Sequence, residues 1–291
     1  MAEPLIDARG VHTHIGASRI LRGVDFRVER GESVALMGRN GMGKTTLLRT
    51  VLGILRPAQG SLRVRGDDVT REPTYRIARR GIAYVPEGRG IFPGLSVREV
   101  AAAARAAGLA THMDGARLMN AVVASGVPAR AFADGIDSVW IDFSKGLGCP
   151  VGAMLAGSRE FIGEAWRLKQ RWGGAMRQAG ILGAAALHAL DHHVERLADD
   201  HANARLLAVS LAELPGIRVD PAAIETNIVF FDVGGTGRGA GALCEALTAR
   251  GVQMGAFGDT LIRAVTHLDV TREHVMRAVD AMREVLAETS R

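Results

Sequence analysis

The chain has 291 residues, of which 47% are hydrophobic, 23% charged and 4% aromatic; this is close to average globular composition and excludes disordered and fibrous classes. Its net charge of +5 comes mainly from arginines scattered along the chain, without a basic run or interleaved aromatic residues, so we expect no nucleic-acid partner. The sequence lacks a signal-peptide core and any apolar stretch long enough to span a bilayer, and it has only two cysteines, so we expect a cytoplasmic protein with no transmembrane segment.

A glycine-rich segment in the first part of the chain has the pattern of a phosphate-binding loop. It follows an apolar run, Ser33–Met37, that predicts a buried strand, and it precedes a predicted helix, Leu47–Leu55. In this setting the backbone N–H groups and the helix N-terminus attract phosphates, a lysine reaches the outer phosphates, and a threonine binds Mg²⁺. The predicted contacts to ATP and Mg²⁺, with Thr45 as the metal ligand, are Gly38, Asn40, Gly41, Gly43, Lys44, Thr45 and Thr46.

A second predicted strand, Gly81–Val85, leads into the segment VPEGR. With the phosphate loop before it, residues 5–99 resemble the start of an ATP-binding-cassette (ABC) transporter ATP-binding protein, most similar to those of branched-chain amino acid importers. The resemblance places Glu87 at the position of the glutamine loop and implies contact with a membrane permease. Ile15 replaces the family's usual aromatic residue, and no later segment matches the signature or Walker B motifs, so we expect no ATP hydrolysis.

The chain changes character at about Arg98, where an alanine-rich helix begins with no proline- or glycine-rich linker before it. We therefore expect the two parts to join inside one helix. Further on, the apolar run Ser138–Phe143 predicts a buried strand that ends at Lys145. A partly desolvated lysine there can act as a nucleophile or form a Schiff base, whereas an isolated lysine in a loop is more often simply solvated. Asp114 and Arg117 follow another short predicted strand and would place an acid and a base at the same edge of the sheet as Lys145.

From about residue 99 to 291 the sequence is similar to low-specificity L-threonine aldolases, which use pyridoxal 5′-phosphate (PLP) on a fold-type I scaffold. The matching segments, in family order, are HMDGARLMNA, DSVWIDFSKGLGCPVG, WGGAMRQAG, HHVERLADDH, IETNIVFFDV and LIRAVTHLDV. The resemblance implies that Lys145 is the internal aldimine lysine, that Asp114 lies against the pyridinium nitrogen, that Arg117 lies near the phenolic oxygen and that Arg263 binds the substrate carboxylate. It also implies a small amino acid substrate and a homodimer or homotetramer.

The predicted fold class is α/β, in three parts. Residues 1–98 form a truncated ABC-type ATP-binding region with the phosphate loop, residues 99–210 a partial fold-type I PLP large domain, and residues 211–291 an α+β small C-terminal domain. In the last part we expect strands at Pro215–Val219 and Leu261–Val265. The aldolase phosphate cup and the histidine that stacks on the cofactor ring have no counterpart in residues 1–98.

Three functions follow from these features and stay open. The first is a PLP-dependent lyase that cleaves threonine or allo-threonine to glycine and acetaldehyde, and the second is the ATP-binding subunit of an amino acid ABC transporter. The third is an inactive fusion of two truncated genes, for which unpaired strand edges and uncovered apolar faces predict poor solubility. His188 and His192 have a spacing that suits a metal, but the lack of a third ligand in register favours a solvated helix face.

Overall fold

The computed structural model describes residues 3–16, 18–39, 41–85 and 94–289. The chain forms two compact units, Met1–Phe92 (unit 1) and Pro93–Arg291 (unit 2), which are described separately below. The finer division at residues 98 and 210 stays a prediction. Among the described residues, no helix has both the length and the apolar character that crossing a bilayer requires.

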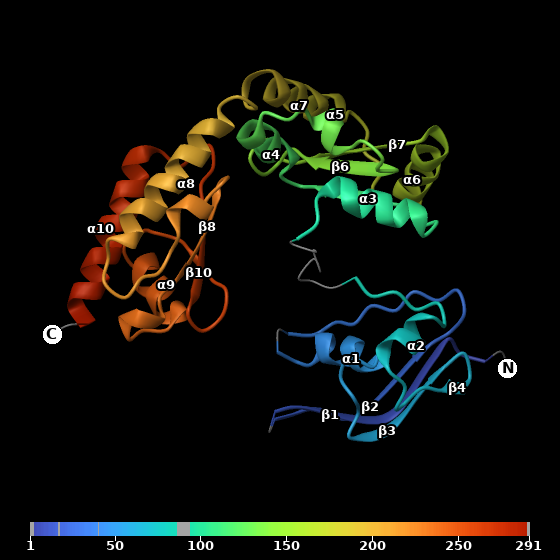
Figure 1. The fold of residues 1–291 in the computed structure, drawn as a ribbon. Helices are drawn as coiled ribbons and strands as arrows, with labels where there is room; N and C mark the ends of the chain where they lie inside the picture. The colour runs from blue at the N-terminus through green and yellow to red at the C-terminus, as the bar shows by residue number, and fades with distance from the viewer. Residues whose placement is uncertain (1–2, 17, 40, 86–93, 290–291) are drawn as a thin grey trace. The chain divides into compact units, whose positions relative to one another are not determined.

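Unit 1 contains an antiparallel sheet with its helices on one face (Figure 1). The strand order is β2-β1-β3-β4, so β1 pairs with both β2 and β3. Leu47 and Val51 of α1 pack against Val11 and Leu62 of the sheet, which closes a small apolar core. The elements are β1 (Ile6–Ile15), β2 (Ser18–Val28), α1 (Lys44–Val51), β3 (Gln59–Val64), β4 (Asp67–Asp68) and α2 (Thr74–Ala78).

Two strands predicted for unit 1 are wrong. Ser33–Met37 has no strand, and most of it is exposed, with Met37 90% exposed. Gly81–Val85 forms no strand either, and Val85 is 91% exposed. Both segments have the apolar composition of central strands, but a strand forms only where a neighbour satisfies its backbone N–H and C=O groups. Within the described residues of unit 1, the strands pair only with one another in the antiparallel sheet, so these segments stay irregular.

Unit 2 begins with a helix that spans the predicted join at residues 98 and 99. The helix α3 (Val97–Ala106) starts with a capping box, in which Ser96 Oγ accepts a hydrogen bond from the Glu99 backbone N–H at 3.3 Å. The Glu99 carboxylate in turn accepts one from the Ser96 backbone N–H at 2.7 Å. The predicted join at residues 98 and 99 would therefore lie inside one regular helix, and its position stays a prediction.

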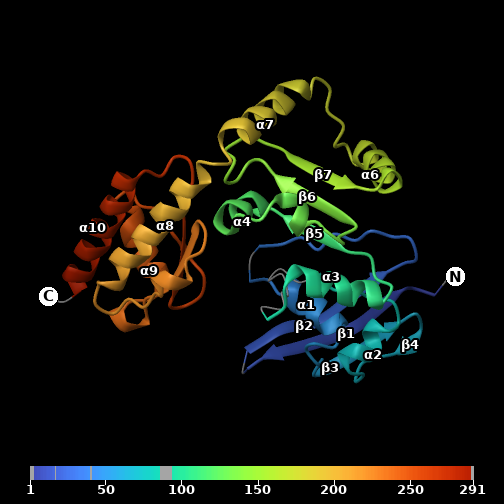
Figure 2. The same cartoon turned by 45° about the horizontal axis from the view of Figure 1, so that its top comes forward.

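The first sheet of unit 2 places two strand ends at the same edge (Figure 2). Its order is β5-β6-β7; β5 and β6 are parallel and pair Asp114 with Trp140, whereas β7 runs antiparallel to β6. The predicted strand before Lys145 is confirmed as β6. The elements of this part are β5 (His112–Gly115), α4 (Leu118–Ser125), α5 (Ala129–Phe132), β6 (Ser138–Asp142), β7 (Ala153–Gly157), α6 (Arg159–Arg171) and α7 (Gly180–His192).

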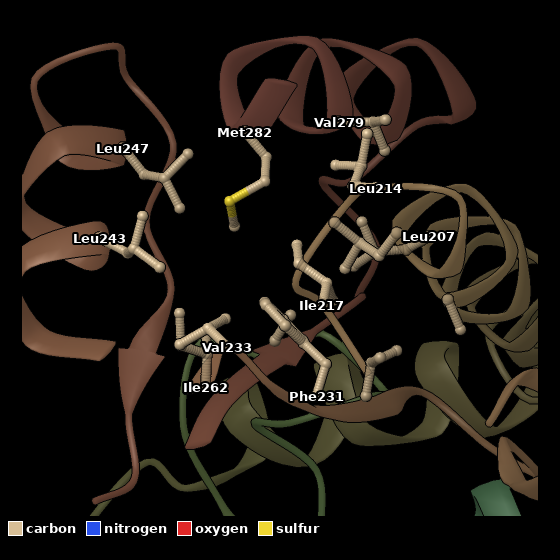
Figure 3. Close-up of a cluster of buried hydrophobic side chains, with 14 of the residues drawn as sticks. Leu207, Leu214, Ile217, Phe231, Val233, Leu243, Leu247, Ile262, Val279 and Met282 are labelled. Atoms are coloured by element: carbon tan, nitrogen blue, oxygen red, sulfur yellow. The ribbon is translucent and has the colours of Figure 1, made fainter. Parts of the chain in front are cut away.

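The last part of unit 2 has the largest apolar core of the described chain. Figure 3 shows Phe231 and Ile262 of the sheet facing Leu243 of α9 and Met282 of α10. The strand Leu261–Val265 is confirmed, but Pro215–Val219 is not a strand, because only Arg218 makes a bridge, to Asp232. The elements are α8 (Leu197–Ala212), β8 (Ile228–Asp232), α9 (Ala240–Thr248), β9 (Gly255–Ala256), β10 (Leu261–Val265) and α10 (Arg272–Thr289), with sheet order β8-β10-β9.

Apolar surface is uncovered on the segment from β7 to α7. Every residue of β7 is exposed, and Met154 and Leu155 are 48% and 38% exposed. Trp166 and Trp172 are also exposed, at 59% and 76%. These are uncovered faces of the kind expected from the sequence, and poor solubility of the isolated chain remains the corresponding prediction.

Replacing Phe231 should destabilise unit 2, because its side chain is 1% exposed and fills the centre of the core. We expect Phe231→Ala to lower the free energy of unfolding by about 3–5 kcal/mol. The matched control is the neighbouring Phe230, which is 41% exposed and contacts the Phe257 ring; Phe230→Ala should cost about 1.5 kcal/mol or less. Urea unfolding followed by circular dichroism measures both, and equal losses would contradict the assignment of the core.

The close approach of β5 and β6 can be tested at Gly115. A Cβ atom on this residue would lie 2.3 Å from the backbone oxygen of Trp140, so Gly115→Ala must push the strands apart and should cost about 1–3 kcal/mol of unfolding free energy. Gly163, inside α6, has open space around it, and Gly163→Ala should stabilise the helix by about 0.5–1 kcal/mol. Thermal or urea unfolding should show that the two substitutions change the free energy of unfolding in opposite directions. A Gly115→Ala variant as stable as the unmodified chain would count against the strand pairing.

Candidate functional site

The loop that contains Lys145 is fixed at both ends and at its middle. The backbone N–H of Phe143 donates to Gly152 O at 3.0 Å, and that of Cys149 donates to Phe143 O at 2.8 Å. Between them, His193 Nδ1, at the end of α7, donates to Leu147 O at 2.7 Å. The backbone around Lys145 is therefore tied to Gly152, just before β7, and to His193, just after α7.

Glycines let this loop lie against the helices beneath it. A Cβ atom on Gly146 would lie 3.0 Å from both Asn120 Oδ1 and Leu197 Cδ2, so a larger residue would lift the loop. Gly148 has φ of +70°, a left-handed conformation that favours glycine. Phe143, Leu147 and Cys149 are buried against α7, and burial raises the pKa of the Cys149 thiol. Cys149 is therefore a buried side chain of this loop.

The Lys145 amine has two contacts. It forms an ion pair with Asp142, the last residue of β6, and it lies 5.2 Å from the centre of the Trp140 ring. Burial alone would raise the pKa of the Asp142 carboxyl group, but hydrogen bonds from Lys145 and Ser144 outweigh it, and the pKa lies below its ordinary value. The lysine therefore has a permanently charged neighbour at neutral pH.

A cavity of about 440 Å³ opens beside the lysine. Arg117, which precedes α4, lines this cavity together with Lys145, so the structure brings these two predicted residues together. The other side is formed by the loop that follows β10. The lining residues are Arg117, Ser144, Lys145, Gly146, Gly148, Cys149, Asn227, Val265, His267, Leu268 and Asp269.

Asp114 and Arg263 are not among the residues that line the cavity. Asp114 is exposed near the carboxyl end of β5, and its Oδ1 accepts a hydrogen bond from the Ala116 backbone N–H at 3.0 Å. It shares the sheet edge with the Lys145 loop, because β5 and β6 are parallel. Arg263 lies on β10 two residues before Val265, on the same face of that strand, and Val265 does line the cavity.

Three polar residues near the lysine were not predicted from the sequence. Asp142 ends β6 three residues before Lys145 and forms an ion pair with it. His267 and Asp269 line the cavity from a segment far away in the sequence, and no local pattern predicts them. Long-range packing alone brings these groups together.

The residues present fit PLP in part. An amine, an arginine and, at the same sheet edge, a carboxylate are the groups that the cofactor's aldehyde, phenolic oxygen and ring nitrogen require. Asn227 is 1% exposed, lines the same cavity and leaves its Oδ1 without a hydrogen-bond donor among the described residues. Since buried acceptors are normally satisfied, this atom is consistent with a polar ligand in the cavity.

The phosphate loop of unit 1 is folded around its own lysine. Lys44 Nζ donates hydrogen bonds to Gly38 O at 2.7 Å and to Arg39 O at 2.9 Å. The helix α1 begins at Lys44, after Gly43 with φ of +88°. Thr45 is exposed, whereas Thr46 is buried. Of the remaining predicted residues, Gly38 and Gly41 lie in this loop, and Asn40 and Glu87 lie outside the described residues.

The histidines of α7 show no metal site. His188 and His192 are exposed with ring centres 4.5 Å apart, which agrees with a solvated helix face. Among the residues that the structure describes, no group of three histidine, cysteine or acidic side chains could hold a metal ion.

Comparison with known proteins confirms both resemblances. The family described as beta-eliminating lyase matches residues 88–233, and the family described as ABC transporter matches residues 21–135. A probable ABC transporter ATP-binding protein from Azorhizobium caulinodans is 43% identical over 98 residues, covering 34% of this chain and 35% of that protein.

The aldolase relatives cover about two thirds of the chain. Low specificity L-threonine aldolase of Escherichia coli strain K12 is 41% identical over 197 residues, covering 68% of this chain and 57% of the relative. Low-specificity L-threonine aldolase 1 of Arabidopsis thaliana is 40% identical over 180 residues, covering 62% and 50%. The chain thus spans about half the length of these curated relatives.

A solved structure supports the fold. Threonine aldolase of Leishmania major aligns with a TM-score of 0.52 and 19% identity, covering 68% of this chain and 59% of that chain. This likeness confirms the α/β fold. Because the lyase family matches half of the chain, the chain belongs to the beta-eliminating lyase family, with a first part similar to ABC transporter ATP-binding proteins.

Proposed function

We propose that unit 2 binds PLP through Lys145 and acts as a lyase that cleaves L-threonine or L-allo-threonine to glycine and acetaldehyde. The observation that supports this most is the Lys145 loop, fixed by hydrogen bonds from its neighbours and open to a cavity that Arg117 also lines. Bound PLP supplies an electron sink for the pair released when the Cα–Cβ bond breaks. The relatives named threonine aldolases match along this segment.

The roles of the residues follow from their chemistry and place. The Asp114 carboxylate, at the edge shared by β5 and β6, would hold a proton on a ring nitrogen. Arg117, at the cavity wall, would donate hydrogen bonds to an anionic oxygen, and Arg263 on β10 would bind the substrate carboxylate with its two-pronged guanidinium. Assembly as a homodimer or homotetramer belongs to the same proposal.

For unit 1 we propose that the phosphate loop binds the phosphates of ATP with Mg²⁺ but does not hydrolyse the nucleotide. Lys44 already lies inside the loop, where it donates to two backbone oxygens that an incoming phosphate would replace. Thr45, exposed in the first turn of α1, would bind Mg²⁺. Contact with a permease is part of this second proposal, which rests on the similarity of residues 21–135 to ABC transporters.

Reduction with borohydride in the presence of PLP tests the lyase proposal. The chain has three lysines, Lys44, Lys145 and Lys169, so peptide mapping assigns the modified residue directly. We expect Lys145 to be modified first and Lys145→Ala to lose the label. Asp114→Asn should lower acetaldehyde formation from L-threonine by about a hundredfold or more, because charge developing in the ring is no longer stabilised. Equal labelling of Lys169 would instead favour an inactive fusion.

Fluorescent ATP titration in the presence of Mg²⁺ tests the nucleotide proposal. Lys44→Ala should weaken binding by about tenfold to a hundredfold, the usual loss for a charge-assisted hydrogen bond. Arg49→Ala is the control, because Arg49 is exposed in the last turn of the same helix. If Lys44→Ala leaves the affinity for ATP unchanged, the nucleotide proposal is wrong.

A further inference from the structure

Asp142 is an acid next to the reactive lysine. Its Oδ2 accepts a hydrogen bond from the Lys145 amine, and its Oδ1 accepts from the Ser144 backbone N–H at 2.7 Å and from Ser144 Oγ at 2.6 Å. Its side chain is only 9% exposed. All of these donors favour the ionised carboxylate, so the group is a fixed negative charge and not a proton carrier.

The position of Asp142 restricts what it can do. It closes β6, where it pairs with Ala153 of β7, and it does not line the cavity that Lys145 lines. A ligand in the cavity would therefore meet the lysine and not the carboxylate. The charged or titratable groups that do face the cavity with Lys145 are Arg117, Cys149, His267 and Asp269. Asp142 acts through Lys145, which makes it a positioning residue.

The ion pair bears directly on the reactivity of the amine. Only the neutral form of a lysine attacks an aldehyde, because the ammonium has no free electron pair. A carboxylate in hydrogen-bond contact stabilises the ammonium, and it also fixes the amine near the Trp140 ring at the base of the loop. An aldehyde in the cavity must therefore compete with Asp142 for this amine.

We propose that Asp142 is the counter-ion that holds the Lys145 amine in an ion pair at the base of the loop, and that it thereby limits the reaction of this lysine with aldehydes. The inference rests on the proposed function, since the PLP aldehyde is the one that Lys145 would meet. It can be tested apart from PLP binding, because a small aldehyde reaches the amine without a cofactor site.

Reductive methylation of the full chain with formaldehyde and cyanoborohydride provides the test. The neutral amine adds to the formaldehyde carbon, water leaves, and hydride from cyanoborohydride reduces the resulting iminium to the methylamine while the reagent is oxidised. Mass spectrometry of peptides gives a separate rate for each lysine. Lys44 and Lys169 serve as references in the same molecule, since neither contacts Asp142.

We expect Asp142→Asn to methylate Lys145 about tenfold faster than the unmodified chain at neutral pH, with Lys44 and Lys169 unchanged. Asp137→Asn is the matched control: this carboxylate also accepts two hydrogen bonds, but from Thr111, and should leave the Lys145 rate unchanged.

Equal Lys145 rates in Asp142→Asn and the unmodified chain would overturn the proposal. A variant that unfolds is recognised by faster methylation of all its lysines, and a second variant then decides. Asp142→Ser, which removes the carboxylate with a smaller side chain, should speed the methylation of Lys145 alone, and an unchanged Lys145 rate would refute the role of Asp142. Failure of PLP to bind affects neither result.

Discussion

The parallel pairing of β5 with β6 is the constraint on which the candidate site depends. Parallel strands bring their carboxyl ends to one edge, and here those ends are followed by Arg117 on one side and by the Lys145 loop on the other. The pairing is tight at Gly115, where a Cβ atom would lie 2.3 Å from the Trp140 oxygen. A change in this spacing would move the lysine loop relative to Arg117 and Asp114.

The predicted strands formed where the described chain provides a neighbouring strand that hydrogen-bonds along the segment. Ser138–Asp142, within the predicted run Ser138–Phe143, and Leu261–Val265 are strands, each with a hydrogen-bonded neighbour. Ser33–Met37 and Gly81–Val85 have equally apolar compositions and form none. Apolar periodicity reports what a segment could bury, but it carries no information about whether a neighbouring strand exists to pair with it.

Site residues that belong to a local sequence motif could be predicted. Site residues that long-range packing brings to the cavity could not. Lys145 and Arg117 were predicted and share a cavity, whereas His267 and Asp269 reach it from a loop more than a hundred residues further along the chain. Asp142 stands only three residues before the lysine, but no motif in the sequence assigns it a role. Its contact with Lys145 depends on the turn that Ser144 makes, which spacing alone does not specify.

The junction between the two resemblances illustrates the difference between helices and sheets. A helix is stabilised by hydrogen bonds between residues four apart, and its start here needs only Ser96 and Glu99, which cap it within one turn. Residues on either side of the predicted join can therefore continue one helix as long as each favours the helical conformation. A sheet instead requires hydrogen-bonding partners from distant parts of the chain. The irregular segments at Ser33–Met37 and Gly81–Val85 and the exposed strand β7 are all strand positions without sufficient partners or cover.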